Sequence, residues 1–459
     1  MQTSVIAGAL IALAAIIGLS VWTGISEKHS KKKELSTPVA VGLLMGTVVG
    51  GSSTIGTAQL AFTYGMSAWW FTLGVGLGCL ILTALFYQPV KASGAATLVG
   101  VVSDRYGHRA GTTASVLNSL GMFINILSQL LSCSAVVLVI FPDAGVIAIA
   151  AGAVVMAFYV GLGGTKGAGV VGILKTVLLY GSMAVCGAIA LTRMGGVSGT
   201  LDTVSRFTLE TGRHYGSLFC RGAGTDLGAG LSLILGMITT QTYMQALLAA
   251  RSDRDARLSG YISSVLAPLL GIFGILVGLY MRTAVPDPGT FVTRTALTEF
   301  ILNYSGLPGI VGGICLGTLF LTAVGTGAGL ALGISTVIDR QLIAKDRSYT
   351  RPLILIVLAA AVITASLPIG DVILRFAFMS MGLRGCTVFV PLCMALWCRR
   401  DIKENWVTAS IAISSLLTFV LGVLNMTGAV VLPCDPVFFG VAASLAVMTA
   451  GLAAGGKRL

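Results

Sequence analysis

A run of small and polar residues interrupts an apolar stretch, residues 41–70, that is otherwise long enough to cross a bilayer. Its middle reads Gly-Gly-Ser-Ser-Thr and supplies the hydroxyls of Ser52, Ser53 and Thr54. Glycine costs a helix interior about 1 kcal/mol relative to alanine, and Ser and Thr compete for backbone hydrogen bonds, so the run disfavours continuous helix. Irregular backbone at membrane depth is tolerated where protein buries it or where it lines a cavity. The pattern predicts a binding site between two half-helices; close helix packing through small residues is the alternative.

Other polar side chains fall within apolar segments and could face the same cavity. Asn125 and Gln129 are four residues apart, which places them on one face of a helix. Thr239, Thr240 and Gln241 fall in a later apolar segment. We predict that these residues bind a substrate together with the hydroxyls of the first run. Each of them could instead form a hydrogen bond between helices, a contact worth about 0.6 kcal/mol on average.

Two basic side chains, Lys175 and Arg384, fall within apolar segments that carry no acidic residue at comparable depth. A charged side chain at the bilayer centre costs about 3 kcal/mol on insertion scales, so such a residue usually has a partner or a function. The guanidinium fork of Arg384 can bind a carboxylate through two hydrogen bonds, which predicts an anionic or zwitterionic substrate. Backbone carbonyls near Pro391 are alternative partners for Arg384, and Lys175 could instead extend to the inner membrane surface.

The composition is that of a polytopic membrane protein. Of 459 residues, 55% are hydrophobic and 10% are charged, and the mean hydropathy is +0.93. The net charge of +12 implies no nucleic-acid partner, because the basic residues sort to one side of the membrane. The 3 histidines lie in loops and the 9 cysteines show no metal-binding spacing, so we predict neither an enzyme nor a bound cofactor. The expected partners are the lipid bilayer and a small-molecule substrate, with no obligatory protein partner.

Apolar runs of about 20 residues, the length at which a helix spans a bilayer, predict about thirteen transmembrane helices in an all-α fold. They cover residues 2–24, 37–64, 67–90, 112–140, 144–163, 168–194, 226–249, 257–281, 308–338, 352–369, 371–398, 404–425 and 436–453. Lys and Arg concentrate in alternate loops, at residues 28–33, 91–109, 163–168, 251–257, 339–351, 399–403 and 457–458. By the positive-inside rule these loops are cytoplasmic. The N-terminus is then outside and the C-terminus inside a plasma membrane, as in a bacterial inner-membrane protein.

Three further segments carry predictions of their own. Residues 316–338 form a second span interrupted by Gly and Thr, and paired interrupted spans are typical of transporters. The polar link 92–111 predicts a short surface helix on the cytoplasmic side. Cys220 and Cys434 both fall in loops that we place outside, so a disulfide between them stays an open alternative.

Five stretches resemble the sodium:solute symporter family. In chain order they read STIGTAQLAFTYGMSAWW, ATLVGVVSDRYGHRAG, FYVGLGGTKGAGVV, QTYMQALLAARSDRDAR and LTAVGTGAGLALGISTVIDRQ. The first resembles the first core helix of the family, the next three resemble its conserved loop, turn and signature motif, and the last resembles its eighth core helix. The resemblance covers nearly the whole chain and keeps the order of the family.

The resemblance implies a LeuT-type fold that works by alternating access within a single transmembrane domain, residues 1–459. Two inverted five-helix repeats would span residues 37–194 and 226–398, and the first and sixth core helices would be broken at the substrate site. One extra helix would precede the repeats at residues 1–36, and two would follow them at residues 399–459.

The resemblance also implies a cation site. Its two backbone carbonyls on the first core helix would fall at Gly46 and Val49, and its ligands on the eighth core helix at Thr322, Gly325 and Thr326. A glycine at position 325 lacks the hydroxyl that the family places there. A sodium ion prefers several hard oxygen ligands, so this site is depleted, although the backbone carbonyls do not depend on side-chain identity.

Lys175 offers a replacement for the missing ligands. Gly172 occupies the position at which the family usually has an aspartate, and Lys175 follows one helical turn later on the same face. Its ammonium could fill the sodium position with its own charge, and its titration could couple transport to protons. The alternative, extension to the inner surface, predicts no role in coupling.

The sequence therefore predicts a cation-coupled symporter for a small polar organic solute that bears a carboxylate, such as an organic acid or an amino acid. Sodium is the coupling ion that the resemblance implies, and a proton is the one that Lys175 suggests. A membrane solute sensor and a passive uniporter or channel are the alternatives.

Overall fold

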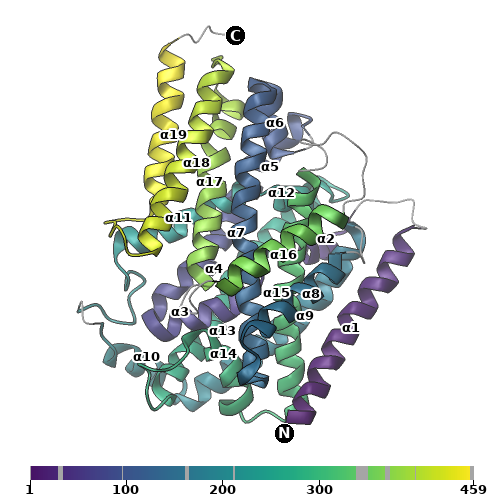
Figure 1. The fold of residues 1–459 in the computed structure, drawn as a ribbon, viewed down its shortest axis with the longest axis vertical. Coiled ribbons are helices and arrows are strands. Elements are labelled where there is room, and N and C mark those ends of the chain that lie inside the picture. Colours follow the sequence, from purple (N-terminus) through teal and green to yellow (C-terminus); the bar gives the residue numbers. More distant parts are fainter. Residues whose placement is uncertain are drawn as a thin grey trace.

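The computed structural model describes residues 2–28, 35–95, 97–160, 165–209, 212–337, 350–366, 373–398 and 400–454. Throughout this part the chain folds into helices and forms no strand, as the apolar segments predict (Figure 1). Many large apolar side chains are exposed on the peripheral helices, among them Ile147, Phe158 and Leu355. Apolar surface of this extent is compatible with a hydrocarbon solvent rather than water, so the protein is an integral membrane protein.

The helices that position the candidate sites are packed in a single bundle (Figure 1). They are α1 (Gln2–Lys28), α2 (Thr37–Val48), α3 (Thr57–Tyr64), α4 (Trp69–Ile81), α5 (Tyr87–Ala92), α6 (Leu98–Tyr106), α7 (His108–Ile140), α8 (Gly145–Val160), α9 (Thr165–Arg193), α10 (Gly196–Arg206), α11 (Ala223–Thr239), α12 (Gln241–Leu248), α13 (Asp253–Ala284), α14 (Ala296–Glu299), α15 (Gly309–Val337), α16 (Thr350–Ser366), α17 (Ile373–Trp397), α18 (Glu404–Met426) and α19 (Pro436–Ala453).

Among the described residues, 10 helices are long and apolar enough to cross a membrane, or up to 11 if the bent pair α11 and α12 forms one span. Two further apolar helices, Thr37–Val48 and Ile354–Ser366, are shorter than a full span. The 41-residue stretch Ser52–Ala92 is twice the length that a bilayer needs, and Gly65, with φ of 59°, turns the chain between α3 and α4. The count of about thirteen crossings stays a prediction.

The predicted interruption of the first core helix is confirmed, with a shift in position. α2 ends at Val48, and Val49 adopts an extended conformation with φ of −86° and ψ of 110°. Helix resumes after Gly50 and includes a wide π-helical turn, Ser52–Gly56, before α3 begins. The backbone therefore opens at Val49 and Gly50, and the three hydroxyl residues lie within the following wide turn.

A second break lies between α11 and α12, as the resemblance to the family implies. Thr240 is extended, with φ of −83° and ψ of 119°, and the two helices meet at an angle of 50°. The prediction that residues 316–338 form an interrupted span is wrong. α15 runs without a break from Gly309 to Val337, because its glycines let neighbouring helices approach instead of ending the helix.

α2 and α9 lie against each other at backbone contact distance. A Cβ atom at Gly42 would lie 2.5 Å from the carbonyl oxygen of Gly169, and one at Gly172 would lie 2.1 Å from the carbonyl oxygen of Gly42. Small residues at such spacing allow transmembrane helices to pack closely. This contact brings α9, which carries Lys175, directly onto the half-helix that ends at the first break.

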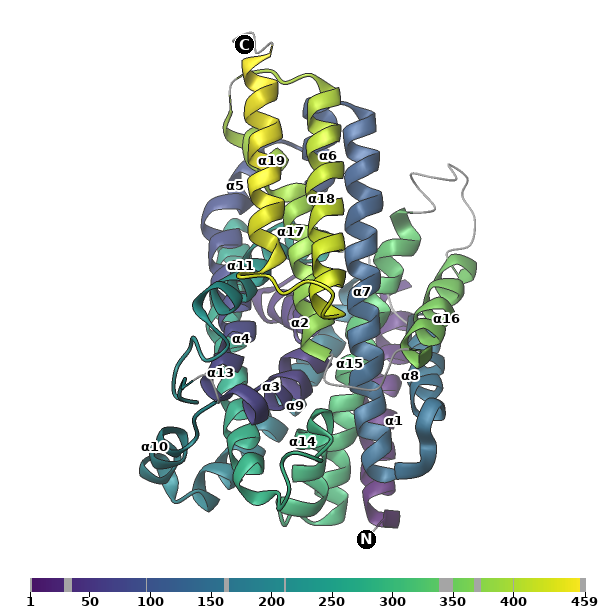
Figure 2. The same cartoon turned by 60° about the vertical axis from the view of Figure 1, so that its left-hand side comes forward.

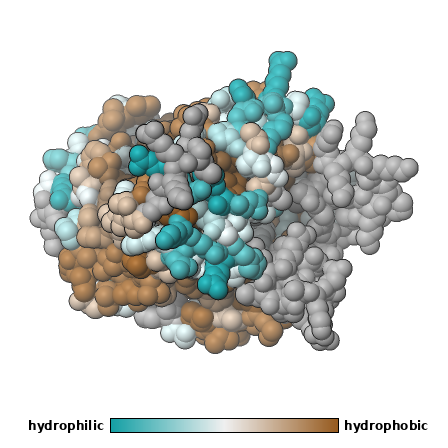
Figure 3. All heavy atoms as spheres, turned by 90° about the horizontal axis from the view of Figure 1, so that it is seen from above, coloured by the Kyte–Doolittle hydropathy of each residue, from teal (hydrophilic) through white to brown (hydrophobic). Residues whose placement is uncertain are grey.

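α1 begins and α19 ends at opposite ends of the molecule (Figures 1 and 2), as an odd number of crossings requires. We call the end at which α1 begins the outer end and the opposite one the inner end, following the sidedness that the loop charges predict. Hydrophilic side chains gather on the inner end, next to apolar surface (Figure 3). α6 confirms the short helix predicted in the link 92–111, and its buried Leu98, Val102 and Tyr106 show that it packs onto the bundle.

Candidate cation and substrate sites

Lys175 lies at the first break, with its side chain 3% exposed. Its Nζ donates hydrogen bonds to the carbonyl oxygen of Gly46 at 2.7 Å and to Oγ1 of Thr326 at 3.4 Å. Gly46 lies in the last turn of α2, where carbonyl groups lack partners within the helix and carry partial negative charge. The structure therefore places an ammonium group on two of the oxygens that the resemblance assigns to a sodium ion.

Of the remaining residues of the predicted cation site, Val49, Gly325 and Thr326 lie beside Lys175, whereas the hydroxyl of Thr322 binds within its own helix. Thr326 Oγ1 donates to the carbonyl oxygen of Val49 at 3.2 Å, which joins α15 to the open backbone of the first break. A Cβ atom at Gly325 would lie 3.4 Å from Lys175 Nζ, so the lysine occupies the space next to the missing hydroxyl. Thr322 donates its hydroxyl to Thr318 of its own helix at 2.7 Å.

A small crevice of about 110 Å³ reaches this site. Its polar lining comes from Ser20 and Thr23 of α1, Thr47 of α2, Tyr159 of α8 and Lys175 of α9. Since α1, α9 and α15 line the crevice with residues of their inner halves and α2 ends beside it, the crevice lies on the inner side of the first break. Its size and polarity suit a few water molecules rather than an organic solute.

Position 172, where the resemblance to the family implies an aspartate, has no space for a side chain. Any side chain at this position would meet the backbone of α2, because its Cβ would lie 2.1 Å from the carbonyl oxygen of Gly42. The contact between the two helices and an aspartate at position 172 are therefore mutually exclusive. Lys175, one turn later, reaches the site from a position with space for a side chain.

Asn125 and Gln129 lie on one face of α7, as predicted, and bind the first break rather than an open cavity. Gln129 Oε1 accepts from the amide of Gly51 at 2.9 Å, and its Nε2 donates to Ser52 Oγ at 3.1 Å and to Asn125 Oδ1 at 3.0 Å. The hydroxyls of Ser52 and Ser128 are 2.8 Å apart. This network satisfies the orphan amide that the break creates, so it fixes α7 to the break.

Ser53 and Thr54 bind the backbone of the break itself. Ser53 Oγ accepts from the amide of Gly50 at 3.0 Å, and Thr54 Oγ1 donates to the carbonyl oxygen of Gly50 at 3.2 Å. Both side chains are buried. A ligand could bind Ser53 or Thr54 only after their bonds to the backbone of Gly50 have broken. Binding at these residues would therefore require a rearrangement of the break.

Arg384 is completely buried in the middle of α17, at the second break. Its Nη1 donates to Thr240 Oγ1 at 2.9 Å, its Nη2 donates to Ser380 Oγ at 3.1 Å, and its Nε donates to the carbonyl oxygen of Ser380 at 3.3 Å. Nη2 also lies 2.7 Å from the sulfur of Met381. Within the described part of the chain it forms no ion pair, so neutral oxygens and a thioether hold a full positive charge.

The other two residues predicted at the second break have local partners. Thr239 donates its hydroxyl to the carbonyl oxygen of Leu235 at 2.8 Å, within α11. Gln241 Oε1 accepts from the amide of Leu98 at 2.7 Å and so caps the first turn of α6. The structure thus brings Thr240 and Arg384 together and directs Gln241 to α6 at the inner end.

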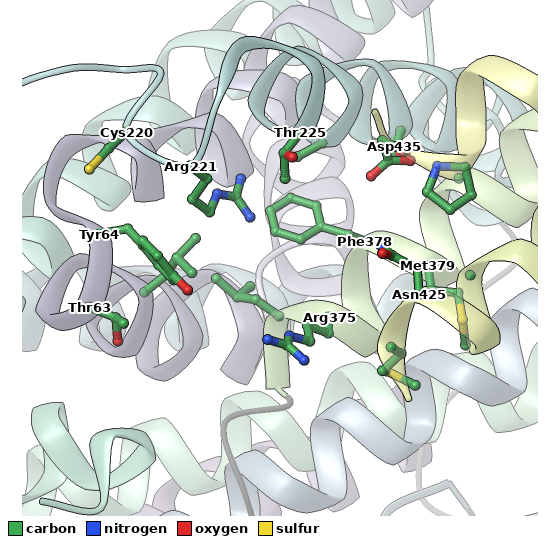
Figure 4. A pocket seen from close by; sticks show the side chains of 18 of the residues that line it. Thr63, Tyr64, Cys220, Arg221, Thr225, Arg375, Phe378, Met379, Asn425 and Asp435 are labelled. Carbon is green, nitrogen blue, oxygen red and sulfur yellow. Dashed lines mark hydrogen bonds between the residues drawn. The ribbon is translucent and has the colours of Figure 1, made fainter. Parts of the chain in front are cut away.

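A cavity of about 440 Å³ lies outward of both breaks, between α3, α11, α17, α18 and the start of α19. Its charged and polar lining includes Arg221, Arg375, Asp435, Tyr64 and Asn425 (Figure 4). We call it the outer cavity. None of the residues predicted to bind substrate lines it. Arg375 is a lining residue that was not predicted, although it is a second arginine in the segment that carries Arg384.

Contacts at the inner end join the two broken helices, beside an open hollow of about 550 Å³ whose lining includes Thr37, Arg251 and Asp255. Leu35, just before α2, exchanges backbone hydrogen bonds of 2.9 Å with Ala249 and Arg251. Thr37 donates its hydroxyl to Asp255, which also accepts from Arg251 Nε at 2.8 Å. These contacts hold the start of the first broken helix against the loop that follows the second one.

Neither a disulfide nor a metal cluster is present among the described residues. Cys220 and Cys434 are both free thiols. The described His, Cys, Asp and Glu side chains include no group of three or more that is arranged to hold a metal ion.

The sequence model of the sodium:solute symporter family matches residues 32–400. Among curated proteins, a high-affinity choline transporter of Caenorhabditis elegans is 24% identical over 286 residues, which are 58% of this chain and 48% of that protein. A monocarboxylic acid transporter of Corynebacterium glutamicum is 22% identical over 329 residues, which are 65% of this chain and 58% of that protein. The chain thus spans about half the length of the curated relatives that it matches.

Among solved structures, a substrate-bound, outward-open Na⁺-coupled sialic acid symporter has a TM-score of 0.74 at 16% identity, over 99% of both chains. A manganese transporter of Eremococcus coleocola has a TM-score of 0.54 at 13% identity, over 91% of this chain and 93% of that one. At these identities the likeness concerns the fold alone. The family and these neighbours are transporters and not enzymes.

Proposed function

The chain belongs to the sodium:solute symporter family, and we propose that it is a symporter for a small organic solute that carries a carboxylate. The observation that carries the proposal is Arg384, a fully buried guanidinium that touches Thr240 at the second break and has no acidic partner among the described residues. A buried cation without an anion is costly, and a substrate carboxylate would supply the missing charge. Arg384 would then be paired with an opposite charge only while the substrate is bound.

We propose that the solute reaches Arg384 between the two breaks. Thr240 is extended and lies between α11 and α12, where its Oγ1 accepts from Arg384 and donates to the carbonyl oxygen of Gly236 at 2.6 Å. A carboxylate that displaces this hydroxyl would take over one bond of Arg384. A carboxylate can accept two parallel hydrogen bonds from one guanidinium, which hydroxyls and a thioether cannot match in strength. The hydroxyls of Ser52, Ser53 and Thr54 at the first break are the proposed partners for the rest of the solute, together with Asn125 and Gln129.

The geometry favours a cation site that is occupied by the ammonium group of Lys175 in place of a coupling ion. Lys175 Nζ already binds Gly46 and Thr326, so a sodium ion at the same oxygens would be opposed by an ammonium group at contact distance. We propose that transport is independent of sodium and that a proton is the coupling ion. The alternative within the same fold is sodium coupling through the carbonyls of Gly46 and Val49 after Lys175 has moved away.

The architecture proposed with this function is that of two inverted repeats, residues 37–194 and 226–398, each of which begins with one of the broken helices. The loop charges support a plasma-membrane orientation with the N-terminus outside and the C-terminus in the cytoplasm. The outer cavity, together with the backbone contacts of Leu35 with Ala249 and Arg251 at the inner end, supports an outward-facing state of an alternating-access cycle.

The experiment is uptake into proteoliposomes containing the full-length protein, with radiolabelled pyruvate as the carboxylate and radiolabelled choline as the cationic contrast. A sodium gradient and a proton gradient are imposed separately, and protein-free liposomes are the control. We expect concentrative pyruvate uptake with the proton gradient alone. Uptake with the sodium gradient alone would overturn the coupling proposal, and choline uptake without pyruvate uptake would overturn the carboxylate proposal. Pyruvate exchange without concentration under either gradient would identify a passive uniporter.

A further inference from the structure

The outer cavity is lined by charged side chains, none of which belongs to the two breaks. Three arginines line it, Arg213, Arg221 and Arg375, against one carboxylate, that of Asp435. Arg221 has its own acidic partner, Asp226, whose carboxylate is fully buried. Even with both acids counted as charged, the cavity keeps an excess positive charge. A volume of about 440 Å³ accommodates a small organic molecule.

Arg221 is held in place as a preformed donor. Its Nε donates to Asp226 Oδ1 at 2.7 Å and to Ser67 Oγ at 3.0 Å, and its side chain is 13% exposed. Its guanidinium carbon lies 5.3 Å from the centre of the Phe378 ring. Its Nη2 is buried and finds no acceptor in the part of the chain that the structure describes. A donor fixed in this way gains a bond from a ligand without a loss of side-chain freedom.

Arg375 supplies the second guanidinium. It is exposed in the first turn of α17 and forms no hydrogen bond or ion pair with any residue that the structure describes. Figure 4 shows Arg375, Arg221 and Tyr64 around one space beside Phe378, with Asn425 and Asp435 on the far side of the ring. The donors come from three separate elements, so they converge on the cavity through the tertiary fold.

We propose that the outer cavity is a binding site for a carboxylate, held between the guanidinium groups of Arg221 and Arg375, from which the solute passes inward to Arg384. The step inward rests on the proposed transport function; the outer site itself does not. The lining elements continue toward the breaks, since α3 follows the first break, α11 precedes the second, and α17 carries both Arg375 and Arg384.

The same geometry disfavours a quaternary ammonium ligand such as choline. Sites for such cations depend on free aromatic faces. The Phe378 ring is already covered by the guanidinium of Arg221, and the excess positive charge of the lining repels a second cation. Of the two solute charges that the curated relatives carry in their names, the outer cavity therefore fits the anion.

The test is equilibrium binding of radiolabelled pyruvate to the purified full-length protein, with Arg375→Gln, Arg375→Lys and the wild type compared. We expect Arg375→Gln to weaken binding about tenfold, because a hydrogen bond to a charged group is worth roughly that factor or more, and Arg375→Lys to restore part of it. The control is Arg206→Gln, which removes a positive charge from an exposed surface pair with Asp202 outside the cavity. It should bind pyruvate as the wild type does.

The same four proteins are then measured for pyruvate uptake. If all four proteins take up pyruvate against its gradient and Arg375→Gln binds pyruvate as tightly as the wild type, the outer site is overturned and the transport function stands. If no protein shows uptake but Arg375→Gln still weakens pyruvate binding, the outer site stands and the transport function fails. Choline that binds the wild type and competes with pyruvate at equal affinity would overturn the site, because the cavity would then not select for negative charge.

Discussion

Two buried cations, Lys175 and Arg384, each lie at a break in a transmembrane helix, yet they are held in different ways. Lys175 donates to a backbone carbonyl of the broken helix and to one hydroxyl, and a narrow polar crevice reaches it from the inner side. Arg384 donates to hydroxyls and to a carbonyl of its own helix, and a large cavity lies on the outer side of its break. The first arrangement places an ammonium among oxygens that could bind a cation, and the second holds a guanidinium on neutral groups, with no acidic partner among the described residues.

The difference follows from the chemistry of the two groups. An ammonium is a compact point charge that can take the place of a metal ion among oxygens, whereas a guanidinium presents a planar fork that matches a carboxylate. The break of α2 presents a carbonyl oxygen to Lys175, and the break of α11 places the hydroxyl of Thr240 against Arg384. In the proposed function, the same kind of backbone break therefore serves two kinds of ligand.

The largest effect is expected for Lys175→Ala. Loss of the ammonium leaves the carbonyl of Gly46 and the hydroxyl of Thr326 without their cation, and charged hydrogen bonds of this kind are worth up to about 3 kcal/mol each. We expect proton-driven uptake of pyruvate to fall about a hundredfold in proteoliposomes. Wild-type uptake rates in the variant, under the proton gradient alone, would show that Lys175 is a packing residue.

A double variant sharpens the same test. Gly325→Ser combined with Lys175→Ala places a hydroxyl in the space that Nζ leaves, because a Cβ at position 325 lies 3.4 Å from Nζ. With the carbonyls of Gly46 and Val49, this change rebuilds an oxygen site for sodium. We expect uptake to recover in the double variant when a sodium gradient is imposed. Equal uptake with sodium and with potassium would contradict a cation site at this break.

Gly172→Ala tests the contact that brings Lys175 to the first break. Its added methyl group would lie 2.1 Å from the carbonyl oxygen of Gly42, so α2 and α9 must separate. Overpacking of this kind costs about 1–3 kcal/mol, which should lower the melting temperature of the purified protein by several degrees. Gly181→Ala on the same helix meets nothing within 4 Å and is the matched control. Equal melting temperatures for the two variants would contradict the close contact of α2 with α9.

Arg384→Lys tests the opposite side of the comparison. The variant keeps the positive charge and loses the fork, so it should retain transport with a half-saturating pyruvate concentration about tenfold higher. The maximal rate should change less than the half-saturating concentration, because the change concerns binding. If Arg384→Gln and Arg384→Lys both transport pyruvate like the wild type, Arg384 serves the packing of α17 and α11 and the substrate is held elsewhere.

The smallest effect is expected for Asp435→Asn in the outer cavity. Burial raises the pKa of the Asp435 carboxyl above its ordinary value, so this group loses its negative charge at a higher pH than an exposed aspartate does. Acidification towards that pKa therefore removes a charge that repels a carboxylate, and pyruvate binding should strengthen as the pH falls. At a pH above the pKa of Asp435, the variant should bind pyruvate about threefold more tightly than the wild type does. Its pyruvate binding should also change less with pH. An unchanged pH profile in Asp435→Asn would remove Asp435 from the site.

The sequence already contained much of the fold because apolar length and loop charge act locally. Helices had to form where apolar residues run for about 20 positions, since a bilayer leaves no other partner for backbone groups. The Gly-Gly-Ser-Ser-Thr run likewise predicts a break. The same reasoning failed for α15, whose glycines permit close packing against α1 and α8, because a glycine pattern by itself does not distinguish a packing face from an interruption.

The sequence alone determined that Lys175 and Arg384 are buried, because the position of a lysine or an arginine within an apolar segment fixes its depth in the membrane. Their partners were decided by the tertiary structure. The carbonyl that faces Lys175 depends on the glycine contact of α2 with α9, and the hydroxyl that faces Arg384 depends on where α11 breaks. Arg221 and Arg375 lie far apart in the chain and share one cavity because α11, α17 and α19 meet there. Spacing along a chain reports the neighbours within one helix, and contacts between helices depend on packing that no single segment encodes.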